Sequence, residues 1–316
     1  MPGALLHAET RSGQPHAPWV QVTKKQHLYA IAVALAMPRA LCCPGALSNV
    51  DVLMHRGGGF VRPMISRRLT SMRFRTFFVV LLLTTFSAAA QAQVVTLNKG
   101  GYTLTYDCTN RTALRYEYVL QADTGSAARP SSFNLDTELP SGCAGQTSTA
   151  SYASVRSGYD RGHLVTSNHM DYNATYIRRA NLMSNIVPQV ASFNQGVWVQ
   201  AENVAECYRD IASVQVYGGV IYSDTSNDYF LSSHGIRTPD FFWKTIITAN
   251  PSGGSRAISW LIPNSANLGS LDSYIVSIDE LEDLYGASTI GISAPAAVKA
   301  MLPSTTWPQP SNCDLG

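Results

Sequence analysis

The sequence predicts an α+β fold with a central antiparallel sheet. Of its 316 residues, 45% are hydrophobic and 14% are charged, so the chain can bury a core and does not have the composition of a disordered protein. Apolar runs of strand length alternate irregularly with helical segments, and no repeated strand–helix–strand unit is visible. This irregular mixture favours an antiparallel sheet over a doubly wound parallel sheet.

The strands are predicted from short apolar runs that end at turn residues. The first two runs flank Lys99, Gly100 and Gly101 and are expected to form a hairpin. The last two are separated by a turn over residues 250–254, which contains Asn, Pro and Gly. The expected strands cover residues 94–97, 102–106, 115–121, 214–222, 241–249 and 256–263. The polar stretch 123–157 is expected to be a long surface loop.

Two helices are predicted from apolar residues at helical spacing and from capping residues. Residues 192–210 are expected to form the longer helix. The shorter helix, over residues 277–284, begins at Ser277, which is expected to form a capping box with Glu280. Gly286 is expected to end it.

The sign of the net charge changes near residue 92, from a basic N-terminal part to an acidic remainder. Residues 1–92 contain ten Lys or Arg and two Asp or Glu, a formal charge of +8, whereas residues 93–316 contain thirteen and nineteen, a formal charge of −6. Residues 72–92 have the order of a secretory signal: two arginines, an apolar run from Phe77 to Phe86, and small residues at Ala90 and Ala92. We therefore expect export, with cleavage after Ala92; a buried helix is the alternative.

An export signal is expected at the start of a protein, so residues 1–71 read as a spurious or unstructured N-terminal extension. A competing signal at residues 24–37 lacks a clear cleavage site. Residues 93–316 are expected to form one domain that is secreted or periplasmic. No apolar run reaches the roughly 18 residues of a clear membrane span, so no stable membrane association is expected after signal cleavage.

Residues 93–316 contain an even number of cysteines, which in an exported protein suggests two disulfides. The four cysteines allow three pairings. Of these, we expect Cys108–Cys143 and Cys207–Cys313. No cysteine or histidine spacing indicates a zinc site.

Polar side chains crowd the stretch from Gly158 to Glu202, and amides are over-represented among them. Amide oxygens do not titrate, but they can bind a hard, mostly hydrated cation such as Mg²⁺. A neutral histidine can deprotonate water, and an arginine can bind a phosphate oxygen. Base, guanidinium and hydrated metal are together the components needed for phosphodiester hydrolysis. The polar residues are Asp160, Arg161, His163, Asn168, His169, Asn181, Asn185, Gln189, Asn194 and Glu202.

Two motifs in this stretch resemble the DNA/RNA non-specific endonucleases, the ββα-metal nucleases that include mitochondrial endonuclease G. The first is the tetrapeptide DRGH from Asp160 to His163. The second runs from Asn181 to Glu202 and reads NLMSNIVPQVASFNQGVWVQAE. The resemblance covers most of residues 158–286, whereas the amino-terminal third matches only loosely. It implies a ββα-metal finger that carries the active site of a metal-dependent endonuclease acting on DNA and RNA without sequence specificity.

The resemblance also implies roles for individual residues. His163 would be the general base, Asn194 the Mg²⁺ ligand, and Glu202 the residue that orients the metal's waters. Arg161 would hold a phosphate. Mn²⁺ is a substitute for Mg²⁺, and a homodimer is one implied assembly. The residues expected to support the metal finger or contact substrate are Arg129, Asn181, Asn185 and Gln189.

Other readings of the same residues remain open at this point. Asp160 is expected to be a structural hydrogen-bond acceptor for turn amides or Arg161, and His169 to be structural or adjacent to the substrate. The formal charge of −6 is unusual for a nucleic-acid-binding protein. The alternatives to an endonuclease are a catalytically silent nucleic-acid-binding module and a phosphoesterase for small substrates.

Overall fold

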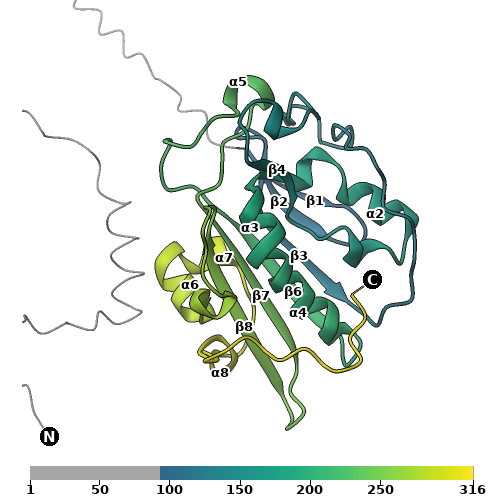
Figure 1. Cartoon of the computed structure of the whole chain (residues 1–316), viewed down its shortest axis with the longest axis vertical. Coiled ribbons are helices and arrows are strands. Elements are labelled where there is room, and N and C mark those ends of the chain that lie inside the picture. Colours follow the sequence, from purple (N-terminus) through teal and green to yellow (C-terminus); the bar gives the residue numbers. More distant parts are fainter. Residues whose placement is uncertain (1–92, 316) are drawn as a thin grey trace, which may run out of the picture. The chain divides into compact units, whose positions relative to one another are not determined.

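A seven-stranded antiparallel sheet forms the centre of the computed structural model, which describes residues 93–315 (Figure 1). The strands lie in the order β1-β2-β3-β6-β7-β8-β9. Their bounds are β1 Val94–Asn98, β2 Thr103–Asp107, β3 Thr112–Leu120, β6 Val214–Ile221, β7 Phe241–Ala249, β8 Ser255–Pro263 and β9 Ile275–Val276. The predicted antiparallel α+β fold is therefore confirmed, and the first two strands pair as the expected hairpin.

Helices cover both faces of the sheet, which explains why β7 is buried along almost its whole length. Successive side chains of a strand point to opposite faces. Phe242 and Ile246 accordingly pack in the core on the side of α4, Val199–Arg209, whereas Trp243 and Ile247 pack in a second cluster. That second cluster includes residues of α6, Ile278–Tyr285, α7, Ala287–Ile290, and α8, Ala296–Lys299.

A separate two-stranded hairpin precedes the helix that lies across the sheet. β4, Tyr159–His163, pairs antiparallel with β5, Ile186–Val190. The chain then enters α3, Ala191–Phe193, and continues through a wide helical turn, η4, Asn194–Trp198, into α4. Two strands followed by a helix therefore bring the two sequence motifs together.

The helix over residues 191–209 is not continuous, in contrast to the single helix expected over 192–210. Gly196 has φ −108° and ψ −111°, which lie outside the helical region, and the axis kinks there. Glycine tolerates such angles because it lacks a Cβ. The kink separates the turn that begins with Asn194 from the regular helix that contains Glu202.

The predicted caps and disulfides are confirmed. Ser277 and Glu280 form the reciprocal capping box at the start of α6, and Gly286 ends that helix. Cys108–Cys143 holds the long loop against the end of β2, and Cys207–Cys313 joins α4 to the C-terminal segment.

Short helices and turns complete the described chain. They are η1 Tyr152–Ser154, η2 Asn168–Met170, α2 Ala174–Ala180, η3 Met183–Asn185, α5 Leu231–His234 and η5 Leu271–Tyr274. Within residues 93–315, none of the helices has the length and hydropathy needed to span a bilayer. The expected export signal and the N-terminal extension lie outside the described residues.

Candidate active site

A cleft of about 420 Å³ lies between the β4–β5 hairpin and the helix that follows it. Its lining contains four residues of the two motifs, Arg161, His163, Asn194 and Glu202, although they are far apart in the sequence. The remaining lining is mainly polar. The lining residues are Arg129, Arg161, His163, Thr166, Ser167, Asn168, His169, Asn194, Gln195, Val199, Glu202, Asn203, Glu206 and Leu315.

His163 is the last residue of β4 and is only 8% exposed. Burial lowers the pKa of its imidazole to about 4, while a hydrogen bond to Asn181 acts in the opposite direction. The imidazole is therefore neutral at physiological pH, which is the state required of a general base.

Hydrogen bonds to Asn181 determine which ring nitrogen of His163 carries the proton. The Asn181 amide nitrogen donates to the backbone carbonyls of Pro130 and Ser132, at 3.0 and 3.2 Å. Its oxygen Oδ1 is therefore the atom that lies 2.9 Å from His163 Nε2. Because Oδ1 can only accept, Nε2 carries the hydrogen and Nδ1 keeps its lone pair.

Asn194 is oriented by Asp160, which lies in β4 three residues before His163. The Asp160 oxygen Oδ2 accepts hydrogen bonds from Asn194 Nδ2 at 2.9 Å and from Gln195 Nε2 at 2.8 Å. The expectation that Asp160 accepts hydrogen bonds is correct, but its donors are these two side-chain amides rather than turn amides or Arg161. Because the Asn194 nitrogen is hydrogen-bonded to Asp160, the amide oxygen Oδ1 remains available as a ligand for a cation.

Glu202 lies in α4 and reaches the same cleft. Its oxygen Oε1 accepts a 2.7 Å hydrogen bond from the Thr166 hydroxyl and lies 3.7 Å from Lys244 Nζ. The other oxygen, Oε2, forms no hydrogen bond with any residue in the described part of the chain.

Arg161 is held in place at the cleft by two contacts. Its Nη1 donates a 2.8 Å hydrogen bond to the carbonyl of Thr149, and its guanidinium lies 4.1 Å from the centroid of the Phe133 ring. A guanidinium has five N–H donors, so the hydrogen bond to Thr149 leaves other N–H groups of Arg161 available to bind an anion. Arg129, which lies outside both motifs, also lines the cleft.

Asn185 and Gln189 lie outside the cleft lining and are fully buried. The Asn185 side chain bonds both the backbone nitrogen and the carbonyl of Val165, and also the carbonyl of Ala180. These are bracing contacts to backbone groups. Asn181 is likewise not a lining residue, although it contacts His163 directly.

Gln189 packs against the glycine of the DRGH tetrapeptide. A Cβ atom at Gly162 would lie 2.0 Å from Gln189 Cδ, so no larger residue fits there without movement. The Gln189 amide nitrogen is 3.4 Å from the His163 carbonyl. The close packing of these two strands therefore sets the position of His163.

His169 belongs to a buried network at the back of the cleft. Its Nδ1 lies 2.8 Å from the Tyr118 hydroxyl, and its Nε2 lies 3.1 Å from Glu206 Oε2. Both ring nitrogens are therefore engaged. These contacts agree with the structural role expected for His169.

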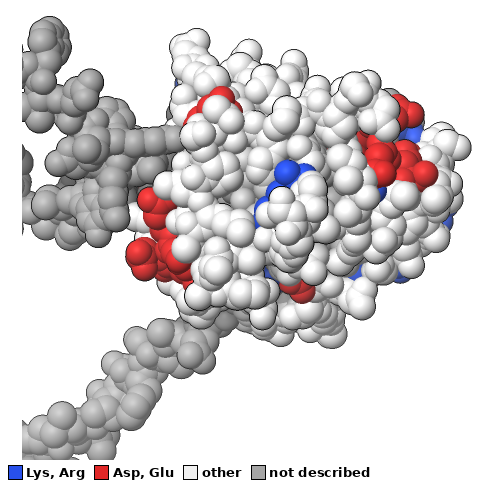
Figure 2. Space-filling model, turned by 90° about the horizontal axis from the view of Figure 1, so that it is seen from below, with Lys and Arg blue, Asp and Glu red and all other residues white. Residues whose placement is uncertain are grey.

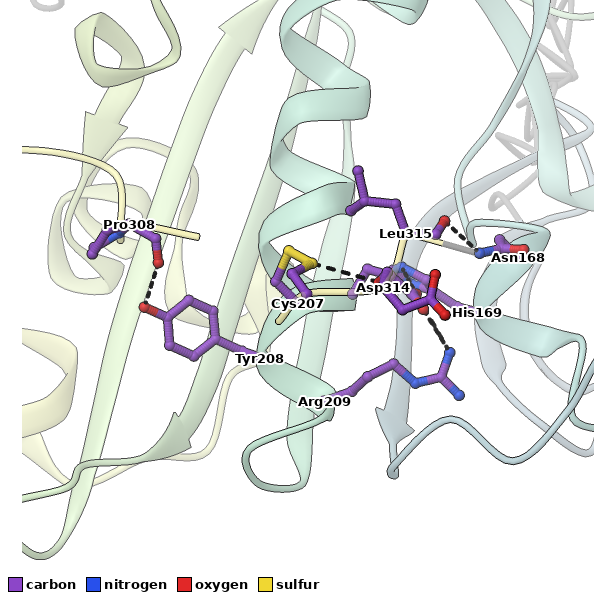
Figure 3. The surroundings of a disulfide bond; sticks show 10 residues. Asn168, His169, Cys207, Tyr208, Arg209, Pro308, Asp314 and Leu315 are labelled. Carbon is purple, nitrogen blue, oxygen red and sulfur yellow. Dashed lines mark hydrogen bonds and ion pairs between the residues drawn. A yellow bond between two sulfur atoms is a disulfide. The ribbon is translucent and has the colours of Figure 1, made fainter. Parts of the chain in front are cut away.

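The C-terminal segment contributes one wall of the cleft. After α8 the chain passes the end of α4 (Figure 1), and the Cys207–Cys313 disulfide attaches it there. The carbonyl of Leu315 accepts a 3.2 Å hydrogen bond from Asn168 Nδ2 (Figure 3). Sequence reasoning did not predict this wall, because nothing local indicates that residue 315 reaches the motif region.

The donor set suits a hard cation held mainly by water. Asn194 Oδ1 and Glu202 Oε2 are both oxygens without a hydrogen bond to another described residue, and Mg²⁺ prefers oxygen ligands and retains several waters. Within residues 93–315, no three His, Cys, Asp or Glu side chains are grouped as a metal cage. One amide oxygen with a nearby carboxylate therefore fits a hydrated Mg²⁺ or Mn²⁺ better than zinc.

The surface does not present a broad basic footprint on the face shown in Figure 2. Acidic side chains gather near two edges of that face, and Lys and Arg form only small groups. This distribution agrees with the formal charge of −6 for residues 93–316. Contacts with a polyanion are therefore expected to depend on the few arginines of the cleft rather than on a charged surface.

The known proteins that are similar in sequence to this chain include nucleases. Residues 82–299 match the family model of the DNA/RNA non-specific endonucleases. A nuclease from Nostoc sp. is 27% identical over 210 residues, which cover 62% of this chain and 73% of that protein. A nuclease from Serratia marcescens is 24% identical over 216 residues, which cover 66% and 80%.

A solved structure supports the fold. The crystal structure of the EndoG/EndoGI complex contains a chain with a TM-score of 0.50 and 21% identity, covering 60% of this chain and 83% of that chain. At this identity, the likeness supports the fold alone.

Proposed function

The chain belongs to the DNA/RNA non-specific endonuclease family, and we propose that it is a metal-dependent endonuclease that hydrolyses phosphodiester bonds of DNA and RNA without sequence specificity. The observation that carries the proposal is the convergence of His163, Asn194 and Glu202 on one cleft. The proposed substrates are DNA and RNA, and the proposed metal is Mg²⁺, with Mn²⁺ as a substitute.

His163 is the proposed general base. Its Nε2–H is engaged by Asn181, so Nδ1 is the atom that takes a proton from the attacking water. The low pKa of the buried imidazole keeps Nδ1 unprotonated at neutral pH. Asn181 acts as a positioning residue, because it sets the tautomer and the orientation of the ring.

Asn194 would hold the metal through Oδ1, and Glu202 would orient metal-bound waters through Oε2. A bound Mg²⁺ supplies stabilisation of the negative charge that develops on the phosphate and the leaving oxygen. Asp160 holds the Asn194 amide in the orientation that this role requires.

Arg161 and Arg129 are the proposed phosphate-binding residues. Both line the cleft, and Arg161 is fixed by Thr149 and Phe133 before any substrate binds. For Asn185 and Gln189 we propose a bracing role in the metal finger, because their amides contact backbone groups outside the cleft.

Nuclease activity is tested with supercoiled plasmid and with RNA. The purified protein should degrade both in the presence of Mg²⁺, stop when EDTA is added, and recover when excess Mg²⁺ is restored. Binding without cleavage would support the silent binding module instead. Hydrolysis of nitrophenyl phosphates with intact plasmid would support a small-substrate phosphoesterase.

Export is a second part of the proposal and rests on the signal-like segment 72–92 and on the two disulfides. Protein recovered from the periplasm or medium should begin at Gln93. Recovery of a chain that retains residues 72–92, or of one that begins near Met1, would contradict this part. Sedimentation of the same protein tests the homodimer that the family resemblance implies.

A further inference from the structure

Lys244 lies beneath Glu202, and its ammonium group is fully buried. The residue is in the middle of β7, with 0% of its side chain exposed. Its Nζ is 3.7 Å from Glu202 Oε1 and 4.3 Å from the centroid of the Trp198 ring. Among the described residues, Nζ has no hydrogen-bond partner, and Glu202 is its only ion-pair partner.

The strand register surrounds this lysine with uncharged groups. Lys244 is directly opposite Gly218 on one side and Trp260 on the other, and Gly218 is opposite Tyr116. Directly opposite residues of antiparallel strands point to the same face. Gly218 leaves room for the aromatic neighbour, since a Cβ there would lie 2.1 Å from the Tyr116 hydroxyl.

Stability alone does not account for a lysine in this position. Removing an ammonium group from water costs several kcal/mol, and an apolar side chain of similar size is often at least as stable. Burial lowers the pKa of Lys244 to about 8, while the Glu202 carboxylate acts in the opposite direction. The position of Nζ, 3.7 Å from Glu202 Oε1, points to a role at Glu202 instead.

The contacts of Glu202 give its two oxygens different surroundings. Thr166 and Lys244 both approach Oε1, at 2.7 and 3.7 Å. Rotation of the carboxylate would separate Oε1 from these two groups. The position of Oε1 therefore determines where Oε2 lies within the cleft.

We propose that Lys244 is a positioning residue that, together with Thr166, fixes the Glu202 carboxylate so that Oε2 faces the hydrated metal of the active site. This inference rests on the proposed function. It adds a residue from the central sheet, outside both sequence motifs, to the metal-binding machinery.

The test is a double-mutant cycle read by Mn²⁺ binding in electron paramagnetic resonance, with DNA cleavage as a second readout. Lys244→Met should raise the Mn²⁺ dissociation constant about tenfold and lower kcat by about 10- to 100-fold, with little change in KM. In a Glu202→Gln background, Lys244→Met should have no further effect on either quantity. Lys299→Met, which breaks the distant Lys299–Glu282 ion pair, is the matched control and should leave both unchanged.

Thr166→Val is the second variant, because it removes the other contact to Oε1 and keeps the side-chain volume. It should weaken Mn²⁺ binding in the same direction, again only when Glu202 is present. Unchanged Mn²⁺ binding in both folded variants would overturn the inference, as would equal losses with and without Glu202. The Mn²⁺ readout does not require cleavage, so failure of the proposed nuclease activity is distinguished from failure of this inference.

Discussion

The side-chain amide of Asn194 donates a 2.9 Å hydrogen bond to the carboxylate of Asp160. Asp160 belongs to the first strand of the small hairpin, and Asn194 begins the helical turn that follows the second strand. The bond therefore joins the two motifs directly. It also fixes the orientation of the Asn194 amide, because a carboxylate can only accept a hydrogen bond.

Asp160→Asn should weaken metal binding without unfolding the protein. An amide at position 160 can donate as well as accept, so the Asn194 amide loses its fixed orientation. Hydrogen bonds to charged groups contribute about 1.5 to 3 kcal/mol, which corresponds to a loss of roughly tenfold or more in Mn²⁺ affinity. Calorimetric titration with Mn²⁺ measures this, and Asp283→Asn, on an exposed residue of α6, controls for the lost charge. Wild-type affinity in Asp160→Asn would contradict the assigned role.

The imidazole of His163 should titrate at about pH 4 in the folded protein and exist as the Nε2–H tautomer. Because burial lowers its pKa below the unfolded value of about 6.5, the unfolded state binds more protons between these two values. The stability from this group is therefore complete above pH 6.5 and is lost as the pH falls toward 4, by about 3 kcal/mol.

Nitrogen-15 spectra of the ring and urea unfolding across this pH range measure both effects. The matched variant His163→Gln should lack this part of the pH dependence. A ring that carries its hydrogen on Nδ1 would show that the arrangement around Asn181 is wrong, and one that titrates near 6.5 would contradict the burial of the imidazole.

Gly162→Ala should destabilise the protein and displace His163. The added Cβ would lie 2.0 Å from Cδ of Gln189, a side chain that is itself fully buried. Overpacking of this kind costs about 1 to 3 kcal/mol. Urea unfolding measures the loss. Gly269→Ala is the matched control, because its Cβ would meet nothing closer than 3.6 Å and should leave stability nearly unchanged.

Loss of the Cys207–Cys313 disulfide should cost more stability than loss of Cys108–Cys143. The two bonds span sequence separations of 106 and 35 residues. In the chain-entropy account, they contribute about 5 and about 4 kcal/mol, respectively. Urea unfolding of the Cys207→Ser/Cys313→Ser and Cys108→Ser/Cys143→Ser double variants tests the order. A larger loss in the second double variant would show that local packing, rather than chain length, dominates.

Much of the fold could be predicted from local sequence. The strands of the hairpin, the buried strands and the α6 capping box depend on side-chain periodicity and on residues three positions apart, both of which are visible in the sequence. The kink at Gly196 was missed, although the glycine itself was the available signal.

Most of the site residues that could be predicted belong to one of the two motifs, and Arg129 is the exception. His163, Asn194 and Glu202 lie in the two motifs, and the structure brings them into one cleft. Their partners were harder to identify, because a hydrogen bond between Asp160 and Asn194 depends on tertiary packing. Lys244 did carry a local signal, since it is a single charged residue inside an apolar strand.

The rate of plasmid cleavage by His163→Ala, compared with the wild-type protein at saturating Mg²⁺, tests the central claim most directly. General-base catalysis contributes about 10² to 10⁴ in rate, so the variant should lose at least a hundredfold in kcat while keeping its circular dichroism spectrum and its Mn²⁺ affinity. A folded His163→Ala protein that cleaves within tenfold of the wild-type rate would contradict the assignment of this histidine as the base.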